Sequence, residues 1–145
     1  MATVKPGLAF SLVCDLGFAV GIVTHSIERV GQLVWIAEPT FDDEPTLDQV
    51  REIKDWRWPV FFPLGAAIRR RLVNSLGVVP VPAKIQKFPL LRSNAGRGWN
   101  LVKFVDGSSR PAGPAKDASI PIYRIVNDTM LKEQIVSGWR PEKEW

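Results

Sequence analysis

The stretch from Gly7 to His25 constrains the fold more than any other part of the chain. Apolar side chains alternate along both of its halves, and Asp15, Leu16 and Gly17 separate the two halves. Alternation with a period of two is typical of strands, and a short polar segment ending in glycine is typical of the turn between them. The stretch therefore predicts an antiparallel β-hairpin in which Gly17 takes a positive φ.

Further strands are expected along the rest of the chain. Gln32–Glu38 carries apolar side chains on both faces, which predicts a strand covered on both sides of its sheet. Trp99–Val105 alternates clearly and predicts another strand. Shorter extended segments are expected at Val60–Phe62, Gly77–Pro82, Lys84–Leu91 and Ile120–Val126. The prolines of the second segment place it at a sheet edge or in a loop, and the Pro/Gly-rich stretch 106–114 is predicted to be a flexible loop.

A capping box predicts the start of one helix. Thr46 and Gln49 stand three residues apart, so that each side chain can bond the other's backbone N–H. The helix they open is expected to run for about three turns and to stop before Trp58, because a residue that precedes proline avoids the helical region. Leu64–Leu72 is ambiguous: it predicts either a short helix or, over Ala66–Val73, a strand.

A last helix is expected near the C-terminus. Asn127 or Asp128 can cap it, it runs through Val136, and Gly138 stands where a helix end favours positive φ. With 145 residues, 46% of them hydrophobic and 23% charged, the chain has the size and composition of one globular domain. The order of elements predicts an α+β domain, with a curved, mainly antiparallel sheet of about six or seven strands and two or three helices packed on it.

Charge is segregated along the chain, although the net charge is only +4. The segment 38–55 holds two bases and seven acids, namely Glu38, Asp42, Asp43, Glu44, Asp48, Glu52 and Asp55. The segment 56–105 holds no acid and nine bases, namely Arg57, Arg69, Arg70, Arg71, Lys84, Lys87, Arg92, Arg97 and Lys103. The two blocks either pair with each other across the fold or form surfaces of opposite sign that attract partners.

The residue types that carry chemistry are sparse. Cys14 and His25 are the only cysteine and the only histidine, and the hairpin register places them about 25 Å apart at ~3.3 Å per residue. Zinc-ligand spacings, a nucleophile elbow and a phosphate-binding loop are all missing from the sequence. Asp42, Asp43 and Glu44 are consecutive, which favours a solvated loop over a cation site. We therefore expect no enzyme activity, no cofactor and no metal.

Several short motifs together form a pattern along the chain. It opens with Gly7–Phe10, the Asp/Gly turn and the return strand Phe18–Val23. Its later landmarks are Phe88–Arg92, Gly98–Trp99, Leu131, Ile135 and Gly138–Trp139. This pattern resembles the immunity protein 26 family, small bacterial proteins that neutralise toxins of polymorphic-toxin or contact-dependent inhibition systems. The resemblance implies a single-domain α+β inhibitor without catalysis, although the long basic middle of the chain departs from the pattern.

Two binding surfaces follow as hypotheses. The first contacts a cognate toxin domain, expected to be a nuclease with a basic cleft, through Phe41, Asp42, Asp43, Glu44, Asp48, Glu52, Asp55 and Trp56. The alternative binds nucleic acid through Arg69, Arg70, Arg71, Lys84, Lys87 and Arg97. A cytoplasmic protein without membrane contact is expected, because the N-terminus resembles no signal peptide and no apolar run is long enough for a membrane helix. A monomer is favoured.

Overall fold

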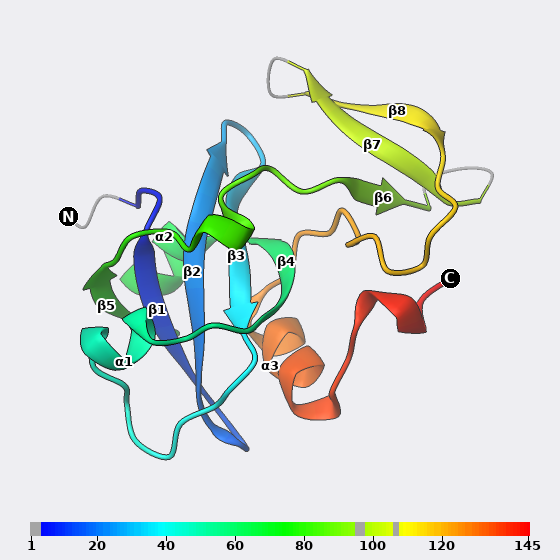
Figure 1. The fold of residues 1–145 in the computed structure, drawn as a ribbon. Helices are drawn as coiled ribbons and strands as arrows, with labels where there is room; N and C mark the ends of the chain where they lie inside the picture. Colours follow the sequence, from blue (N-terminus) through cyan, green and yellow to red (C-terminus); the bar gives the residue numbers. More distant parts are fainter. Residues whose placement is uncertain (1–3, 95–97, 106–107) are drawn as a thin grey trace.

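The strands form two antiparallel sheets, and helices cover the larger sheet. The computed structural model describes residues 4–94, 98–105 and 108–145 (Figure 1). The larger sheet has the order β4-β3-β2-β1-β5 and the smaller one the order β6-β7-β8. The strands of the larger sheet are β1 (Leu8–Cys14), β2 (Gly17–Ile27), β3 (Gly31–Ala37), β4 (Trp56–Phe62) and β5 (Asn74–Val78). The smaller sheet contains β6 (Leu91–Ser93), β7 (Asn100–Val105) and β8 (Ser108–Pro114).

Three α-helices and two 3₁₀ turns complete the described elements. They are α1 (Leu47–Arg51), α2 (Leu64–Arg69), α3 (Asp128–Ser137), η1 (Ala83–Ile85) and η2 (Pro141–Lys143). The α+β class predicted from the sequence is confirmed, with the strands divided between two sheets rather than joined in one. Asn127 caps α3, and Gly138 at its C-terminal end has φ 69°, both as predicted.

The β1–β2 hairpin is built as the sequence indicates. Cys14 pairs with Gly17, and Gly17 has φ 110°. A Cβ atom at Gly17 would lie 2.4 Å from the carbonyl oxygen of Phe41, so this position needs glycine for its backbone angle and for close packing. Further along the ribbon Gly21 lies opposite Phe10, whose ring occupies the space that a side chain at Gly21 would fill.

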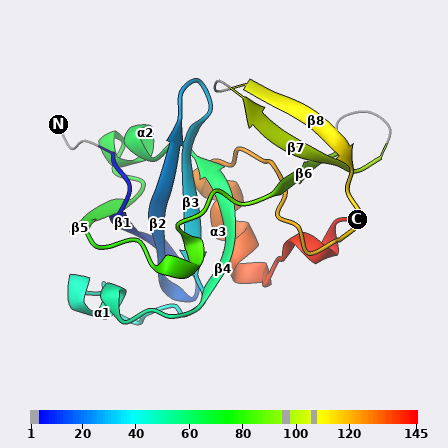
Figure 2. The same ribbon diagram turned by 45° about the horizontal axis from the view of Figure 1, so that its top comes forward.

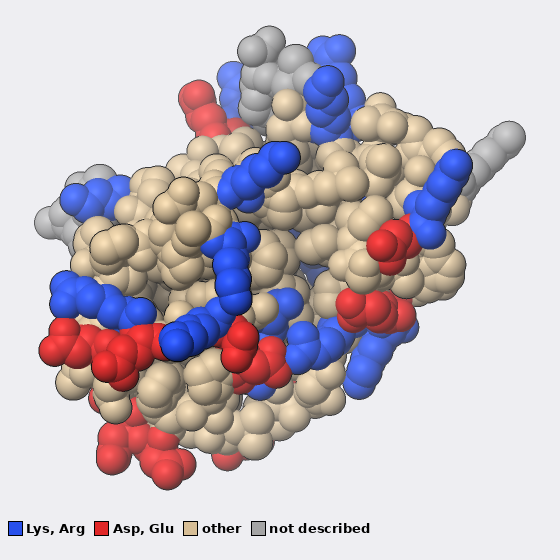
Figure 3. Space-filling view, viewed as in Figure 1, with Lys and Arg blue, Asp and Glu red and all other residues tan. Residues whose placement is uncertain are grey.

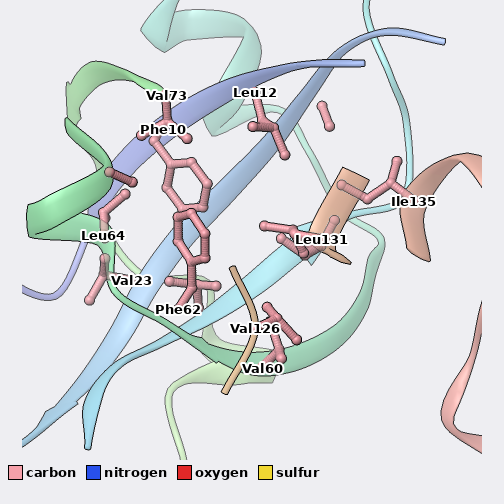
Figure 4. Packing of buried hydrophobic residues seen from close by; sticks show 14 of the residues in the cluster. Phe10, Leu12, Val23, Val60, Phe62, Leu64, Val73, Val126, Leu131 and Ile135 are labelled. Atoms are coloured by element: carbon pink, nitrogen blue, oxygen red, sulfur yellow. The ribbon is translucent and has the colours of Figure 1, made fainter. Parts of the chain in front are cut away.

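Both faces of the larger sheet are buried. On one face Phe10 and Phe62 stack with ring centroids 5.9 Å apart, and Leu131 of α3 and Leu64 of α2 pack in the same cluster (Figure 4). On the other face β1 and β2 pack against α1, η1 and the chain between them, with buried residues Ala9, Val20, Ile22, Ala37, Val50, Ile53, Val79 and Ile85. The expectation that β3 is covered on both sides is confirmed.

The predicted three-turn helix after Thr46 is wrong in length. The helix α1 contains five residues, and the chain then extends into β4 at Trp56 instead of Val60. The residues from Trp56 onward pair with β3 instead of continuing the helix. The strand can include Pro59 because β4 is an edge strand, where a missing N–H costs no ladder hydrogen bond. The ambiguous segment that begins at Leu64 forms the helix α2.

Two other extended segments are corrected. Lys84–Leu91 is not an edge strand: η1 and irregular chain occupy it, and pairing begins only at Leu91. Conversely, the predicted loop 106–114 contains β8, which pairs with β7 although all of its residues are exposed. Its proline and glycine composition indicates a loop, but β7 offers an edge with which β8 pairs.

The predicted last strand, Ile120–Val126, joins the two sheets instead of extending either one. Arg92 of β6 exchanges backbone hydrogen bonds with Pro121 and Tyr123, and Phe61 of β4 does so with Arg124 and Val126. Figure 1 and Figure 2 show this segment in orange, passing between the two sheets. Only isolated parallel bridges form, because the segment contacts one sheet and then the other within a few residues.

Candidate functional site

The six carboxylates proposed for partner binding lie together in space. Asp42, Asp43 and Glu44 stand on the loop between β3 and α1, Asp48 on α1, and Glu52 and Asp55 between α1 and β4, and all six are exposed. Figure 3 shows acidic side chains gathered over α1 and the loop before it, with basic side chains directly above them. We call these six residues the acidic surface.

The loop that carries the acidic surface is anchored at both ends. Phe41 exchanges two backbone hydrogen bonds with Phe18 of β2, at 2.7 and 2.9 Å. At the other end the predicted capping box is present: the amide of Gln49 donates to Thr46 Oγ1 at 3.3 Å, and the amide of Thr46 donates to Gln49 Oε1 at 2.9 Å. Glu44 accepts hydrogen bonds from Asn74 Nδ2. The backbone that carries these carboxylates is therefore anchored before any partner arrives.

The acidic surface is not neutralised by the basic block. Asp48 pairs with Arg51 at 2.9 Å, while Glu38, beside the surface, pairs with Arg140 at 2.7 Å and contacts Arg57 at 3.8 Å. Among the described residues, no ion pair joins the acidic surface to the bases between positions 69 and 103. In the described part of the chain, ion pairing between the two charged segments is thus limited to the contact of Glu38 with Arg57, and the structure favours surfaces of opposite sign over mutual pairing.

The two aromatic residues proposed beside the acids are half-buried. Phe41 and Trp56 both pack on the apolar cluster beneath α1. Trp56 also lines a hollow of about 460 Å³ together with Trp35, Asp55 and Lys84. The indole N–H groups of Trp35 and Trp56 are buried, and neither donates a hydrogen bond within the described part of the protein. Such orphan donors cost roughly 1–3 kcal/mol each.

The residues of the nucleic-acid alternative are separated. Arg69, Arg70 and Arg71 lie at the end of α2, which packs on one face of the larger sheet. Lys84 and Lys87 lie in and just after η1, which packs on the opposite face. Arg97 lies outside the described residues. The bases that are neighbours in sequence thus form no continuous described surface for a nucleic-acid backbone.

A groove between the two sheets is the surface that sequence reasoning missed. It measures about 1090 Å³ and is lined by residues of β2, β3, β7 and β8 and of the segments 84–90 and 119–121. Lys84, Lys87 and Lys103 are its charged lining residues among those described, and we call it the lysine-rimmed groove. No local sequence signal identifies it, because its lining comes from segments far apart in the chain.

Cys14 and His25 are apart, as the hairpin register predicts. Cys14 stands beside the β1–β2 turn, whereas His25 pairs with Leu33 near the far end of β2. His25 Nδ1 lies 3.0 Å from Thr24 Oγ1, and the imidazole meets the ring of Phe88 edge-on. Burial lowers the pKa of His25, and a hydrogen bond with the backbone of Gln86 opposes that shift. Neither geometry nor distance makes a nucleophile–base pair of them.

The described residues contain no group of three or more His, Cys, Asp and Glu side chains placed to hold a metal ion. In the same part of the chain, no helix combines the length and the apolar character needed to cross a bilayer. No protein-family model, no curated protein and no solved structure matches the chain. The family resemblance therefore stays a prediction, and any function has to be argued from the surfaces themselves.

Proposed function

We propose that this protein is an immunity protein that binds a cognate bacterial toxin domain through the acidic surface and neutralises it by occluding its active site. The proposal is carried by the exposure of four carboxylates of the acidic surface and by their lack of ion-pair partners among the described residues. Asp42, Asp43, Glu52 and Asp55 are exposed and have no ion-pair partner among the described residues, yet the first two stand on a loop anchored to β2 and the other two on the short segment between the capped helix α1 and β4.

An arrangement of this kind suits a basic target. Carboxylates carried by an anchored backbone lose less conformational freedom on binding than those on a mobile loop, and their common sign accelerates the approach of a positively charged partner. A nuclease is the class of toxin that fits best, because its cleft holds basic groups for phosphates, and carboxylates can occupy the same positions. The resemblance to toxin-neutralising proteins supports the same reading.

The proposal predicts that a gene for a large secreted protein lies beside the gene for this chain. The test co-expresses the C-terminal domain of that protein with this chain in bacteria. The wild-type chain should restore growth, and Asp42→Lys, Asp43→Lys and Glu52→Lys combined should abolish protection. With the purified proteins at low salt, this triple variant should associate at least about tenfold more slowly, because rim charges act mainly on the association rate.

The matched control reverses three exposed acids elsewhere, Glu28, Glu133 and Glu142. This control makes the same change in net charge and should still protect. If both triple variants protect, the acidic surface is not the contact. If the wild-type chain neither protects against the neighbouring toxin domain nor binds it, the immunity function itself is wrong.

A further inference from the structure

The lysine-rimmed groove has the charge of a binding site for an anionic partner. Lys84 and Lys87 come from the segment that contains and follows η1, Lys103 comes from β7, and all three converge on the groove; none of the described residues that line it is acidic. The basic side chains down the middle of the face in Figure 3 lie over η1 and the segment that leads from it to β6. A negative occupant is therefore favoured, and a positive one is repelled.

The floor of the groove is apolar and preformed. The rings of Phe88 and Phe104 meet edge to face at 5.4 Å, and Phe104 stacks on Tyr123 at 5.3 Å. Leu90 adds an aliphatic surface that is 54% exposed, which is high for a leucine. The groove thus offers hydrophobic contact over its floor and positive charge at its rim.

The floor also discriminates between classes of anionic partner. A single-stranded nucleic acid stacks its bases on free aromatic faces. Here one face of Phe104 is covered by Tyr123, and Phe88 contacts both His25 and Phe104. The third aromatic lining residue, Trp35, is half-buried and packs against the apolar cluster beneath α1. Aliphatic side chains need no such face. A volume of about 1090 Å³ also exceeds the usual range for a small metabolite and suits a peptide segment.

We propose that the lysine-rimmed groove binds a short segment of a partner protein that carries acidic and apolar side chains together. The apolar side chains pack on Phe88, Leu90 and Phe104, and the carboxylates pair with the three lysines. This site has the opposite sign to the acidic surface, so it stands or falls independently of the proposed toxin contact.

The test measures binding of a fluorescein-labelled short peptide that alternates glutamate and leucine to the full-length protein at low salt. Three further probes are the same peptide with lysine for glutamate, the same peptide with serine for leucine, and single-stranded oligothymidylate. The glutamate–leucine peptide should bind, and both peptide controls should bind at least about tenfold more weakly, since charge and apolar contact are both required.

Variants of the groove locate the binding. Lys87→Glu with Lys103→Glu should weaken it at least about tenfold, and Leu90→Asp should do the same. Lys5→Glu with Lys143→Glu changes the net charge equally at exposed positions outside the groove and should leave binding unchanged. Because all these side chains are exposed, each variant should unfold at the wild-type temperature.

Amide chemical shifts provide a readout that does not depend on affinity. The peptide should perturb Leu90, Val102 and Ala112 and should leave Asn74 unperturbed. The proposal is overturned if the dissociation constant is weaker than roughly 1 mM, if the groove variants bind like the control variant, or if the shifts lie elsewhere. Preferential binding of oligothymidylate in the groove would also overturn it, in favour of a nucleic-acid site.

Discussion

Arg92 is completely buried, and its guanidinium joins three parts of the chain. Nε donates to the carbonyl oxygen of Ile120 at 2.8 Å, and Nη2 donates to those of Ala118, Pro141 and Glu144. The guanidinium lies over the indole rings of Trp99 and Trp145, at 4.0 and 5.2 Å from their centroids. Burial lowers the pKa of Arg92 and Coulombic attraction to Glu144 opposes the shift, but an arginine stays charged in a protein.

Replacing Arg92 with methionine should therefore strongly destabilise the folded protein. The substitution keeps an apolar stem but leaves several buried carbonyl groups without a donor, so the free energy of unfolding should fall by about 3 kcal/mol or more. Urea denaturation measures the change. Arg70→Met, at an exposed position, is the control and should stay within about 0.5 kcal/mol of wild type. Equal stability of the two variants would contradict the role given to Arg92.

At the scale of elements, the C-terminal segment after α3 is held by one carboxylate. Glu144 accepts from both terminal nitrogens of Arg124 at 2.7 Å and from Trp139 Nε1 at 2.8 Å. The hydrogen bonds from Arg124 are the main cause that lowers the pKa of Glu144, and burial opposes them. This segment supplies two of the carbonyl oxygens that accept hydrogen bonds from Arg92. By holding the segment in place, the Glu144 carboxylate also helps to keep the Arg92 guanidinium buried.

The lowered pKa predicts how stability depends on pH. A carboxylate whose folded pKa is depressed stabilises the protein above its unfolded pKa, near 4.5, and loses that contribution as pH falls through the folded value. Glu144→Gln should lower the free energy of unfolding at about pH 7 and make it fall less steeply below about pH 4.5. Urea denaturation across this range measures both effects. The control Glu133→Gln, at an exposed position, should keep the wild-type dependence of unfolding free energy on pH. If Glu144→Gln also keeps that dependence, the Glu144 carboxylate does not hold the segment.

At the scale of the whole molecule, the smaller sheet is attached to the larger one by segment 121–126 and by aromatic packing. Phe61 of β4 lies 5.8 Å from Phe104 of β7 and 5.5 Å from Tyr123, ring centroid to ring centroid. Leu33 and Leu91 are buried in the same small cluster. This junction forms the floor of the lysine-rimmed groove, so the groove depends on the relative position of the two sheets.

Removing one ring at the junction should loosen the smaller sheet selectively. Phe104→Ala deletes contacts to Phe61, Phe88 and Tyr123, and should cost roughly 2 kcal/mol because Phe104 is only half-buried. Hydrogen exchange should accelerate at the described amides of β7 and β8 and stay slow in β1, β2 and β3. The control is Leu72→Ala, at an exposed position shortly after α2, which should leave hydrogen exchange unchanged in both sheets. Uniform acceleration in both sheets would mean that they unfold as one unit.

The features predicted correctly from the sequence have causes within a few residues of one another. The hairpin with Gly17 at positive φ, the capping box of Thr46, the cap at Asn127 and the glycine end at Gly138 are all of this kind. The clustering of the six acids belongs with them, because one loop, one short helix and the segment directly after that helix carry them all. Local periodicity, turn chemistry and sequence proximity were sufficient for each.

The features that the sequence left open or misplaced depend on partners far along the chain. The helix α1 ends early because β3 pairs with the residues from Trp56 onward, β8 forms because β7 offers it an edge, and segment 121–126 is divided between two sheets. Arg92, one base among nine in its block, is buried because the C-terminal segment closes over it. Long-range pairing supplies hydrogen bonds and burial that outweigh local propensity.

The sequence by itself therefore determined the class of fold, the first hairpin and the acidic surface. Only the tertiary structure decided that Arg69–Arg71 are separated from Lys84 and Lys87, and that Lys103 of β7 meets these two lysines around an apolar groove. The physical reason is that side chains close in sequence share a surface only while the chain stays on one face. The bases cross from one face of the larger sheet to the other, whereas the acids do not.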